Sequence, residues 1–252
     1  MNAVVVLQVR MGSSRLPGKA MLPLDGTPAL VHEIRRAAAA EPFGVDDVVV
    51  ATSANDRDDV IEFVAEREGA RVYRGSESDV IGRVHRAMAA ADADVAVRLC
   101  GDNTLIDPQL PTALLEVLQT ADADYASTKF ERTFPIGHNA DAFTRETIRR
   151  AADDAESDYH REHVGQYFKD GRERFDTATV TADAVFDESV RNAVPDFSAL
   201  RLTMDEADDY RLLSRVYESV PHDEILDTAD AIRYIAEEEL AGINADVEQA
   251  VW

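Results

Sequence analysis

Short apolar runs alternate with longer amphipathic stretches through the first half of the chain. The apolar runs are brief and rich in β-branched residues, as in AVVVLQV at 3–9, and this pattern predicts strands. The stretches between them space their apolar residues as a helix does, and several begin at a proline or end at a glycine. Alternation of this kind predicts a mainly parallel sheet with helices on both faces. The predicted strands are 3–9, 47–52, 70–75, 94–100 and 123–128, and the predicted helices are 28–40, 56–69, 79–91 and 108–121.

The regular alternation ends near residue 128. We interpret residues 129–197, which combine short strand-like runs with helical stretches, as a small accessory lobe. The run SALRLTM at 198–204 predicts one further strand. The 252 residues are therefore expected to form a single α/β domain, 1–252, that includes this lobe. The helices predicted in this half lie near 145–156, 158–170, 206–219 and 227–241.

Acidic residues outnumber basic ones by 49 to 26, which gives a formal net charge of −23. The acids are scattered along the chain, and such a coat is typical of halophilic proteins, which work in concentrated salt. It repels nucleic acid and anionic membranes, so neither is an expected partner. The single cysteine, Cys100, excludes an intrachain disulfide, and no signal peptide or membrane-spanning run is recognisable. We therefore expect a cytoplasmic protein.

The stretch LQVRMGSSRLPGKAM at 7–21 concentrates positive charge directly after the first predicted strand. We call its residues 10–19 the basic loop, and in an open parallel sheet a loop at this position faces the ligand. Its side chains and glycines suit a polyphosphate, although a merely exposed loop is the alternative. It is not a Walker P-loop, because the glycine spacing is one residue too long and Ala20 replaces the required hydroxyl. The residues that would contact the anion are Arg10, Gly12, Ser13, Ser14, Arg15, Gly18 and Lys19.

Two carboxylates follow the ends of predicted strands. Asp102 stands in RLCGDNTLID after the strand at 94–100, and Asp205 stands in LRLTMDEADDY after the run at 198–204. We expect both at the edge of the sheet that carries the basic loop, close enough together to hold Mg²⁺ facing the phosphates. Capping of a helix N-terminus is the alternative role for each.

Six stretches, in order along residues 3–218, resemble one family. They are QVRMGSSRLPGKAMLPLDGTP, VVVATSANDRDDVI, VYRGSESDVIGRV, VRLCGDNTLIDP, REHVGQYF and LRLTMDEADDYRLLSRVYE. They resemble the nucleotidyltransferases named for spore coat polysaccharide biosynthesis protein F, relatives of the acylneuraminate and 3-deoxy-manno-octulosonate cytidylyltransferases. The resemblance implies a Rossmann-like, three-layer nucleotidyltransferase fold and a homodimer formed through the accessory lobe. It also implies transfer of CMP from CTP to a sugar acid, with Mg²⁺ and release of pyrophosphate, for surface polysaccharide or glycan biosynthesis.

The matching motifs assign roles by position. Arg10, Ser13, Arg15 and Lys19 would hold the triphosphate, Asp102 and Asp205 would hold Mg²⁺, and Arg98 would support the same strand end. Of these, Arg10, Lys19, Asp102 and Asp205 are the expected catalytic residues. The nucleotide-facing loops would contribute Ser53, Asn55, Arg74, Gly75, Ser76 and Asp79. Candidates for the acceptor side are Asn139, Asp141, His160 and His163, none of which is assigned as a general base.

One motif departs from the family pattern. PIGHNADAF stands where relatives tend to carry PDGLDVE, so Ile136 and Asn139 replace acids and Asp141 replaces a glutamate. Three hypotheses therefore remain. The chain is a sugar-acid cytidylyltransferase, a nucleotidyltransferase that uses another base or a sugar phosphate, or a non-catalytic nucleotide-binding relative or partner subunit. Comparing the binding of four nucleotides, and testing for pyrophosphate release, distinguishes them.

Overall fold

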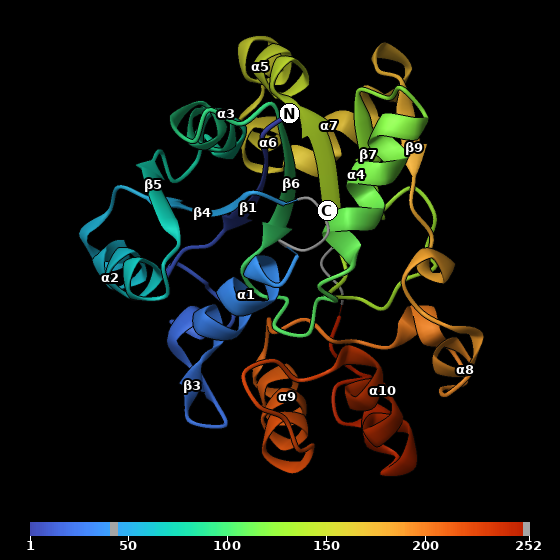
Figure 1. The fold of residues 1–252 in the computed structure, drawn as a ribbon. Coiled ribbons are helices and arrows are strands. Elements are labelled where there is room, and N and C mark those ends of the chain that lie inside the picture. Colours follow the sequence, from blue (N-terminus) through green and yellow to red (C-terminus); the bar gives the residue numbers. More distant parts are fainter. Residues whose placement is uncertain (41–44, 249–252) are drawn as a thin grey trace.

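The computed structural model describes residues 1–40 and 45–248. Within them a seven-stranded sheet crosses the molecule in the order β5-β4-β1-β6-β8-β7-β9, with helices packed around it (Figure 1). The sheet strands are β1 (Ala3–Gln8), β4 (Asp47–Ser53), β5 (Arg71–Gly75), β6 (Val95–Cys100), β7 (Tyr125–Ser127), β8 (Ala140–Thr144) and β9 (Thr177–Thr179), and β2 (Pro23–Leu24) pairs with β3 (Thr27–Pro28) as a separate hairpin. The helices are α1 (Ala29–Ala38), α2 (Asp59–Arg67), α3 (Val80–Ala90), α4 (Leu110–Thr120), α5 (Arg145–Asp154), α6 (Asp158–Glu162), α7 (Val164–Asp170), α8 (Glu188–Arg191), α9 (Ala207–Ser219) and α10 (Thr228–Glu237).

The sheet is mainly parallel, as the sequence predicts. β1 pairs in parallel with β4 and with β6, β4 pairs in parallel with β5, and β7 with β9. Only β8, among the sheet strands described, runs against its neighbours β6 and β7. The continuous apolar run of β1 fits its position inside the sheet, because a strand covered on both faces needs apolar side chains on both.

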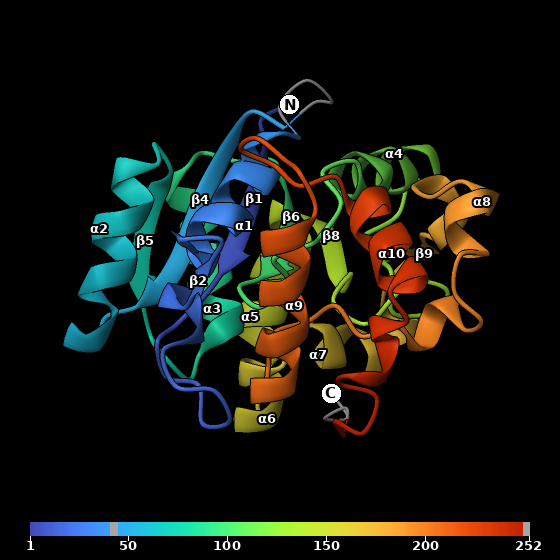
Figure 2. The same cartoon turned by 90° about the horizontal axis from the view of Figure 1, so that it is seen from below.

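Two apolar cores lie on opposite faces of the sheet. Val5 and Leu7 of β1 belong to the core that contains the buried sides of α1, α4, α9 and α10. Val4 and Val6 point to the other face, where α3, α5 and α7 close the second core. Figure 2 shows α1, α9 and α10 along one side of the molecule. The expected three-layer α/β architecture is therefore confirmed.

The stretch 129–197, interpreted from the sequence as an accessory lobe, contributes two strands to the sheet. Its strand β8 lies between β6 and β7, and β9 forms the edge of the same sheet. The single long helix expected at 158–170 divides into α6 and α7, because the backbone of His163 is not helical, with φ −106° and ψ 78°. A role of this stretch in dimer formation stays a prediction.

The prediction of a strand at 198–204 is wrong. A 3₁₀ turn occupies Phe197–Ala199, and the following residues make only an isolated bridge to Ile136, outside the seven-stranded sheet. Leu200, Leu202 and Met204 are nevertheless buried in the core beside α9. The alternating pattern therefore reflects an extended segment that packs its apolar side chains inward without joining the sheet.

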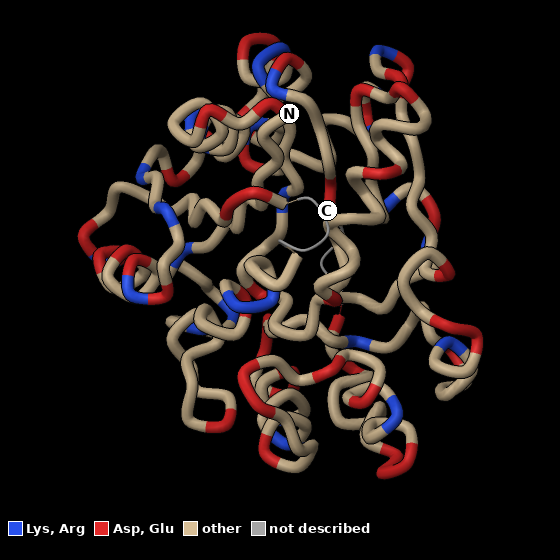
Figure 3. Tube along the Cα trace, viewed as in Figure 1, with Lys and Arg blue, Asp and Glu red and all other residues tan. Residues whose placement is uncertain are grey.

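Charged residues are spread over the outer helices and loops, with acidic positions in every part of the molecule (Figure 3). This distribution matches the scattering of acids along the sequence, and adaptation to high salt stays a prediction. Among the described residues, no helix has the length and apolarity that crossing a membrane requires.

His138 is an unusual core residue. Its side chain is 0% exposed and packs against the rings of Phe134 and Phe186, with centroids 6.2 and 5.4 Å away. Neither ring nitrogen has a hydrogen-bond partner among the described residues. Burial, with a smaller effect from Arg36, lowers the pKa of this histidine from 6.5 to about 3. The folded protein therefore keeps His138 neutral at a pH where the unfolded chain protonates it.

His138→Leu should remove part of the acid sensitivity of the fold. Because the folded-state pKa is lowered, the wild-type protein loses stability as the pH falls through the unfolded-state value of about 6.5. We expect the variant's advantage over wild type to grow by about 2 kcal/mol between about pH 7.5 and about pH 5. Urea denaturation at both pH values measures this, with His160→Gln as the control. An advantage that is equal at both pH values would contradict a neutral, unpartnered His138.

Candidate active site

The basic loop begins where β1 ends, at the edge of the sheet at which β4, β5 and β6 also end. Gly18 adopts the left-handed conformation, with φ +71°, which favours glycine. Its carbonyl starts the 3₁₀ turn Lys19–Met21 by accepting the N–H of Met21 at 2.8 Å. This turn directs Lys19 toward two segments. One follows β6 and carries Asp102, and the other precedes α9 and carries Asp205.

Lys19 joins the two carboxylates that the sequence singled out. Its Nζ donates to Oδ2 of Asp102 at 2.9 Å and to Oδ1 of Asp205 at 2.8 Å. The two oxygens are therefore no more than about 6 Å apart, which confirms the expected proximity. Although burial opposes it, the charges of Asp102 and Asp205 raise the pKa of Lys19 above its ordinary value. Burial likewise opposes ionisation of Asp205, yet Lys19, Arg15 and Arg201 hold its pKa below the usual value.

The two arginines of the basic loop are also held by carboxylates. Arg15 forms ion pairs with Asp205 at 3.1 Å and Glu206 at 3.7 Å. Arg10 reaches Glu162 at 3.1 Å and Glu77 at 3.6 Å. All three cations of the loop are thus neutralised from outside it, and a bound polyphosphate would have to replace these carboxylates.

The hydroxyl groups of the basic loop have different surroundings. Ser13 accepts the backbone N–H of Leu16 at 3.2 Å, so its hydroxyl helps to shape the loop. Ser14 is exposed. A Cβ atom at Gly12 would lie 2.7 Å from a guanidinium nitrogen of Arg57, so the loop backbone approaches this side chain closely. The loop therefore packs closely against the segment that follows β4.

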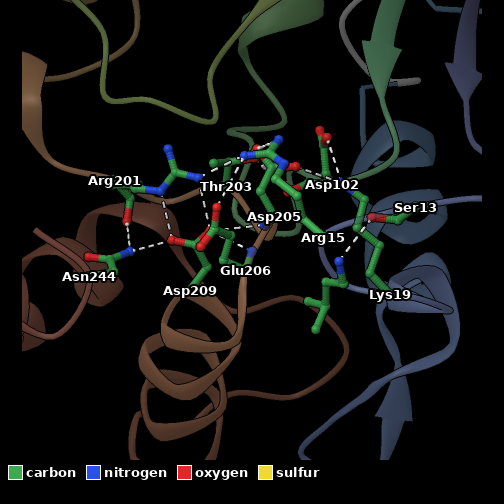
Figure 4. Close-up of polar contacts among 11 residues, drawn as sticks. Ser13, Arg15, Lys19, Asp102, Arg201, Thr203, Asp205, Glu206, Asp209 and Asn244 are labelled. Atoms are coloured by element: carbon green, nitrogen blue, oxygen red, sulfur yellow. Dashed lines mark hydrogen bonds and ion pairs between the residues drawn. The ribbon is translucent and has the colours of Figure 1, made fainter. Parts of the chain in front are cut away.

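A buried ionic network fixes the segment that carries Asp205 (Figure 4). Asp209 is 0% exposed and accepts two hydrogen bonds from Arg201, at 2.7 and 2.9 Å, and one from Asn244 at 2.9 Å. It also accepts the backbone N–H groups of Asp205 and Glu206, at 2.9 and 3.0 Å. Glu206 and Asp209 form the capping box of α9, so helix capping is not the role of Asp205. Sequence analysis did not identify Arg201, Asp209 or Asn244.

Several residues assigned to nucleotide-facing loops instead hold those loops in place. The buried hydroxyl of Ser53 donates to Asp58, and Arg74 donates to the carbonyl of Ser53 at 3.0 Å. Ser76 accepts the N–H of Asp79 at 3.0 Å, and Asp79 caps α3. Gly75 ends β5, where its carbonyl accepts the N–H of Ala54 at 2.8 Å. Direct contact of these side chains with a nucleotide stays a prediction.

An open hollow of about 540 Å³ lies between the segments that follow β4 and β5. It is lined by Ala54, Asn55, Asp56, Arg57 and Glu77. Glu77 pairs with Arg57, accepts the amide of Asn55 at 2.6 Å and lies 3.6 Å from Arg10. The hollow therefore opens beside the basic loop, as a nucleotide site at this edge requires.

Asp141 is not available to an acceptor, contrary to expectation. It is 0% exposed, and its Oδ1 accepts the hydroxyl groups of Tyr125 at 2.5 Å and Ser127 at 2.8 Å. Its Oδ2 pairs with the buried guanidinium of Arg98. Burial alone would raise the pKa of Asp141, but Lys129 and Arg98 hold it well below its usual value. Asp141 therefore anchors Arg98 from inside the sheet.

The other acceptor candidates lie in different surroundings. His160 pairs with Asp170 at 3.1 Å. His163 stands between α6 and α7, and burial lowers its pKa. Asn139 directly precedes β8, whose first residue, Ala140, is opposite the last part of β6. Lys129, which sequence analysis missed, lies at the same edge with its Nζ 3.8 Å from Asp141.

One family model, described as Cytidylyltransferase, matches residues 4–233. The chain belongs to the cytidylyltransferase family. Its relatives include spore coat polysaccharide biosynthesis protein SpsF of Bacillus subtilis, 31% identical over 222 residues that make up 86% of this chain and 88% of that protein. A 3-deoxy-manno-octulosonate cytidylyltransferase of Mesorhizobium japonicum is 37% identical over 139 residues, 52% of this chain and 54% of the other.

Solved structures place this cytidylyltransferase in the same fold. A cytidylyltransferase from Leptospira borgpetersenii superposes with a TM-score of 0.84 at 28% identity, over 100% of this chain and 99% of that chain. A CMP:2-keto-3-deoxy-manno-octonic acid synthetase complexed with CTP gives a TM-score of 0.55 at 21% identity, over 72% of this chain and 91% of the other. The second likeness supports the fold alone.

The carboxylates of this cytidylyltransferase suit a magnesium ion. Mg²⁺ prefers oxygen ligands and is commonly held by one or two carboxylates together with substrate phosphates and water. Asp102 and Asp205 already converge on one cation, the ammonium of Lys19. No group of three or more potential ligands gathers among the described residues, so phosphate and water would have to complete the shell.

Proposed function

We propose that this chain transfers CMP from CTP to a sugar acid and releases pyrophosphate in a Mg²⁺-dependent reaction. The observation that carries the proposal is the junction of Lys19 with Asp102 and Asp205 beneath a loop that holds two further cations. Membership of the cytidylyltransferase family supports the choice of CTP. The sugar-acid acceptor rests on relatives whose names state that activity.

In this mechanism a hydroxyl oxygen of the acceptor forms a bond to the α-phosphorus, the bond from that phosphorus to the oxygen that bridges to the β-phosphate breaks, and the hydroxyl proton passes to solvent. Arg10, Arg15 and Lys19 exchange their carboxylate partners for phosphate oxygens and stabilise the charge that develops on pyrophosphate. Asp102 and Asp205 would hold Mg²⁺, which neutralises and orients the phosphate oxygens when bound. The hollow lined by Asn55 and its neighbours would receive the nucleoside.

The acceptor would lie on the side of Lys129, where the structure leaves positive charge. Asp141 pairs closely with the buried Arg98 and more loosely with Lys129, whose Nζ lies 3.8 Å away, so an anionic group of the acceptor would share the charge of Lys129 with Asp141. A Cβ atom at position 165 would come within 2.9 Å of the Lys129 ammonium, so Gly165 leaves room for it. A carboxylate or a phosphate on the acceptor suits this position, and Asn139 and His163 stay candidates for contacts with it.

Two alternatives remain. The enzyme could use a different base or a sugar phosphate, and the replacement of family acids by Ile136 and Asn139 favours an altered acceptor. A non-catalytic relative would bind nucleotide through the same loop without turnover. We further propose a cytoplasmic homodimer that supplies activated sugars for polysaccharide or glycan synthesis.

Pyrophosphate release tests the proposal. The protein is incubated with Mg²⁺ and each of four nucleoside triphosphates, together with a panel of 2-keto sugar acids and a matching panel of sugar phosphates. We expect release only with CTP and a sugar acid. Release with sugar phosphates alone would contradict the acceptor class, and nucleotide binding without release in either panel would favour the non-catalytic alternative.

A further inference from the structure

Glu33 places a carboxyl group inside the protein beneath the candidate metal site. It belongs to α1, is 2% exposed and accepts the backbone N–H of Asn103 through Oε1 at 3.0 Å. Its other oxygen is buried and has no hydrogen-bond partner among the described residues. A buried carboxyl oxygen without a partner destabilises a fold. The position therefore favours an apolar side chain unless the carboxyl group has another role.

The hydrogen bond from Asn103 fixes one specific peptide unit. The N–H of Asn103 and the carbonyl of Asp102 belong to the same planar group, because they flank one peptide bond. That carbonyl accepts the N–H of Met204 at 2.8 Å and the hydroxyl of Thr203 at 3.2 Å. The peptide plane is thus held at both ends, by Glu33 on one side and by the segment leading to Asp205 on the other.

This arrangement links the two carboxylates through the backbone. Met204 directly precedes Asp205, so its bond to Asp102 sets the distance between the two segments. The hydrogen bond from the N–H of Asn103 to Glu33 opposes rotation of the Asp102–Asn103 peptide about its flanking bonds. With this peptide held in place, the Asp102 side chain points toward Asp205. Both carboxylates then reach the ammonium of Lys19.

We propose that Glu33 is a positioning residue of the metal site, which fixes the Asp102–Asn103 peptide so that Asp102 and Asp205 can hold one divalent ion. This inference rests on the metal-binding role of Asp102 and Asp205 within the proposed function. Glu33 acts through the backbone of Asn103 and contacts neither substrate nor metal. Removal of a partner that orients a metal ligand typically weakens metal affinity by about 10–100-fold.

Glu33→Gln and Glu33→Leu form the informative pair. Gln has a side chain of the same length and keeps a carbonyl oxygen that can accept the N–H of Asn103. Leu has a similar side-chain volume but no hydrogen-bond acceptor. In Glu33→Leu we expect Mn²⁺ binding in the presence of CTP, measured by electron paramagnetic resonance, to weaken by about tenfold or more. We also expect the Asn103 amide to exchange with solvent faster by about tenfold or more, and kcat to fall while KM for CTP changes little. Glu33→Gln should stay close to wild type in all three measurements.

The control is His32→Leu, another buried polar residue of α1, whose ring contacts the carbonyl of Leu24 at 3.0 Å. It should change stability without changing Mn²⁺ affinity. Unchanged Mn²⁺ affinity and amide exchange in Glu33→Leu would overturn the positioning role. If Glu33→Leu does not fold, Glu33→Asp, which shortens the reach, should give the same weakened binding, and wild-type affinity in Glu33→Asp would overturn the role as well. Absence of Mn²⁺ binding by the wild-type protein in the presence of CTP would instead contradict the proposed metal site itself, together with any role for Glu33 in it.

Discussion

Asp102→Asn and Asp205→Asn should each lower turnover by about a hundredfold or more while the fold stays intact. Such a loss corresponds to about 3 kcal/mol of transition-state stabilisation. Both carboxylates contact the same ammonium of Lys19, so each contributes an oxygen to one small volume beneath the basic loop. A neutral amide retains the size of the side chain and removes the charge that a divalent ion needs. Turnover is measured as pyrophosphate release at saturating CTP and Mg²⁺.

Glu206→Gln is the matched control for these variants. Glu206 is the neighbour of Asp205 and pairs with Arg15 at 3.7 Å, but it makes no contact with Lys19 among those that the structure records for the described residues. Its loss should change turnover by less than about tenfold, as for a partly exposed ion pair. Turnover that is equally reduced in all three variants would indicate a general effect of surface charge. Unfolding of the two Asp→Asn variants would indicate a structural role for Asp102 and Asp205.

Lys19→Ala should weaken binding of CTP by about 1.5–3 kcal/mol, the range for hydrogen bonds to a charged group. The raised pKa of Lys19 keeps its ammonium charged through the neutral and mildly alkaline range, so the loss should not depend on pH there. Removing the ammonium also deprives Asp102 and Asp205 of the cation that they share, although Arg15 and Arg201 still contact Asp205. We therefore expect a lower melting temperature in the absence of Mg²⁺ and partial recovery when Mg²⁺ is added.

Lys169→Ala provides the comparison, since Lys169 is an exposed lysine at the end of α7. It should bind CTP as the wild type does. Normal CTP affinity in Lys19→Ala, together with a low melting temperature that Mg²⁺ does not raise, would identify Lys19 as a structural residue only. Calorimetric titration and thermal melting with and without Mg²⁺ supply both observations.

The first half of the fold was predictable from sequence because each parallel strand there is a short apolar run. The strands β1, β4, β5 and β6 all lie within two residues of their predicted limits. The limits of β8 were not predicted, because its second residue, Asp141, is charged and the burial of this carboxylate depends on Arg98, 43 positions away. At 198–204 a strand was predicted that does not exist. The alternating apolar residues there pack against the core, but the segment does not join the sheet.

The candidate site was also predictable only in part. The proximity of Asp102 and Asp205 was predicted, and for Asp102 the reason holds, since it follows β6 at the carboxyl edge of the sheet. For Asp205 the predicted strand is absent, and an extended segment outside the sheet places it there. The residues that fix the two carboxylates were not predicted. Glu33 lies in an amphipathic helix and meets Asn103 across 70 positions of sequence, and Asp209 is one of several acids in a short stretch. Only the packed structure shows which of these acids are buried and what each one holds.

The central claim is that the basic loop and its neighbouring carboxylates bind CTP with a divalent ion. Calorimetric titration of the wild-type protein with CTP, UTP, ATP and GTP, each with Mg²⁺, tests it most directly. We expect CTP to bind most tightly and the omission of Mg²⁺ to weaken its binding. Equal affinities for the four nucleotides would remove the cytidine assignment and leave only a polyphosphate site, and no binding of any of them would contradict the account.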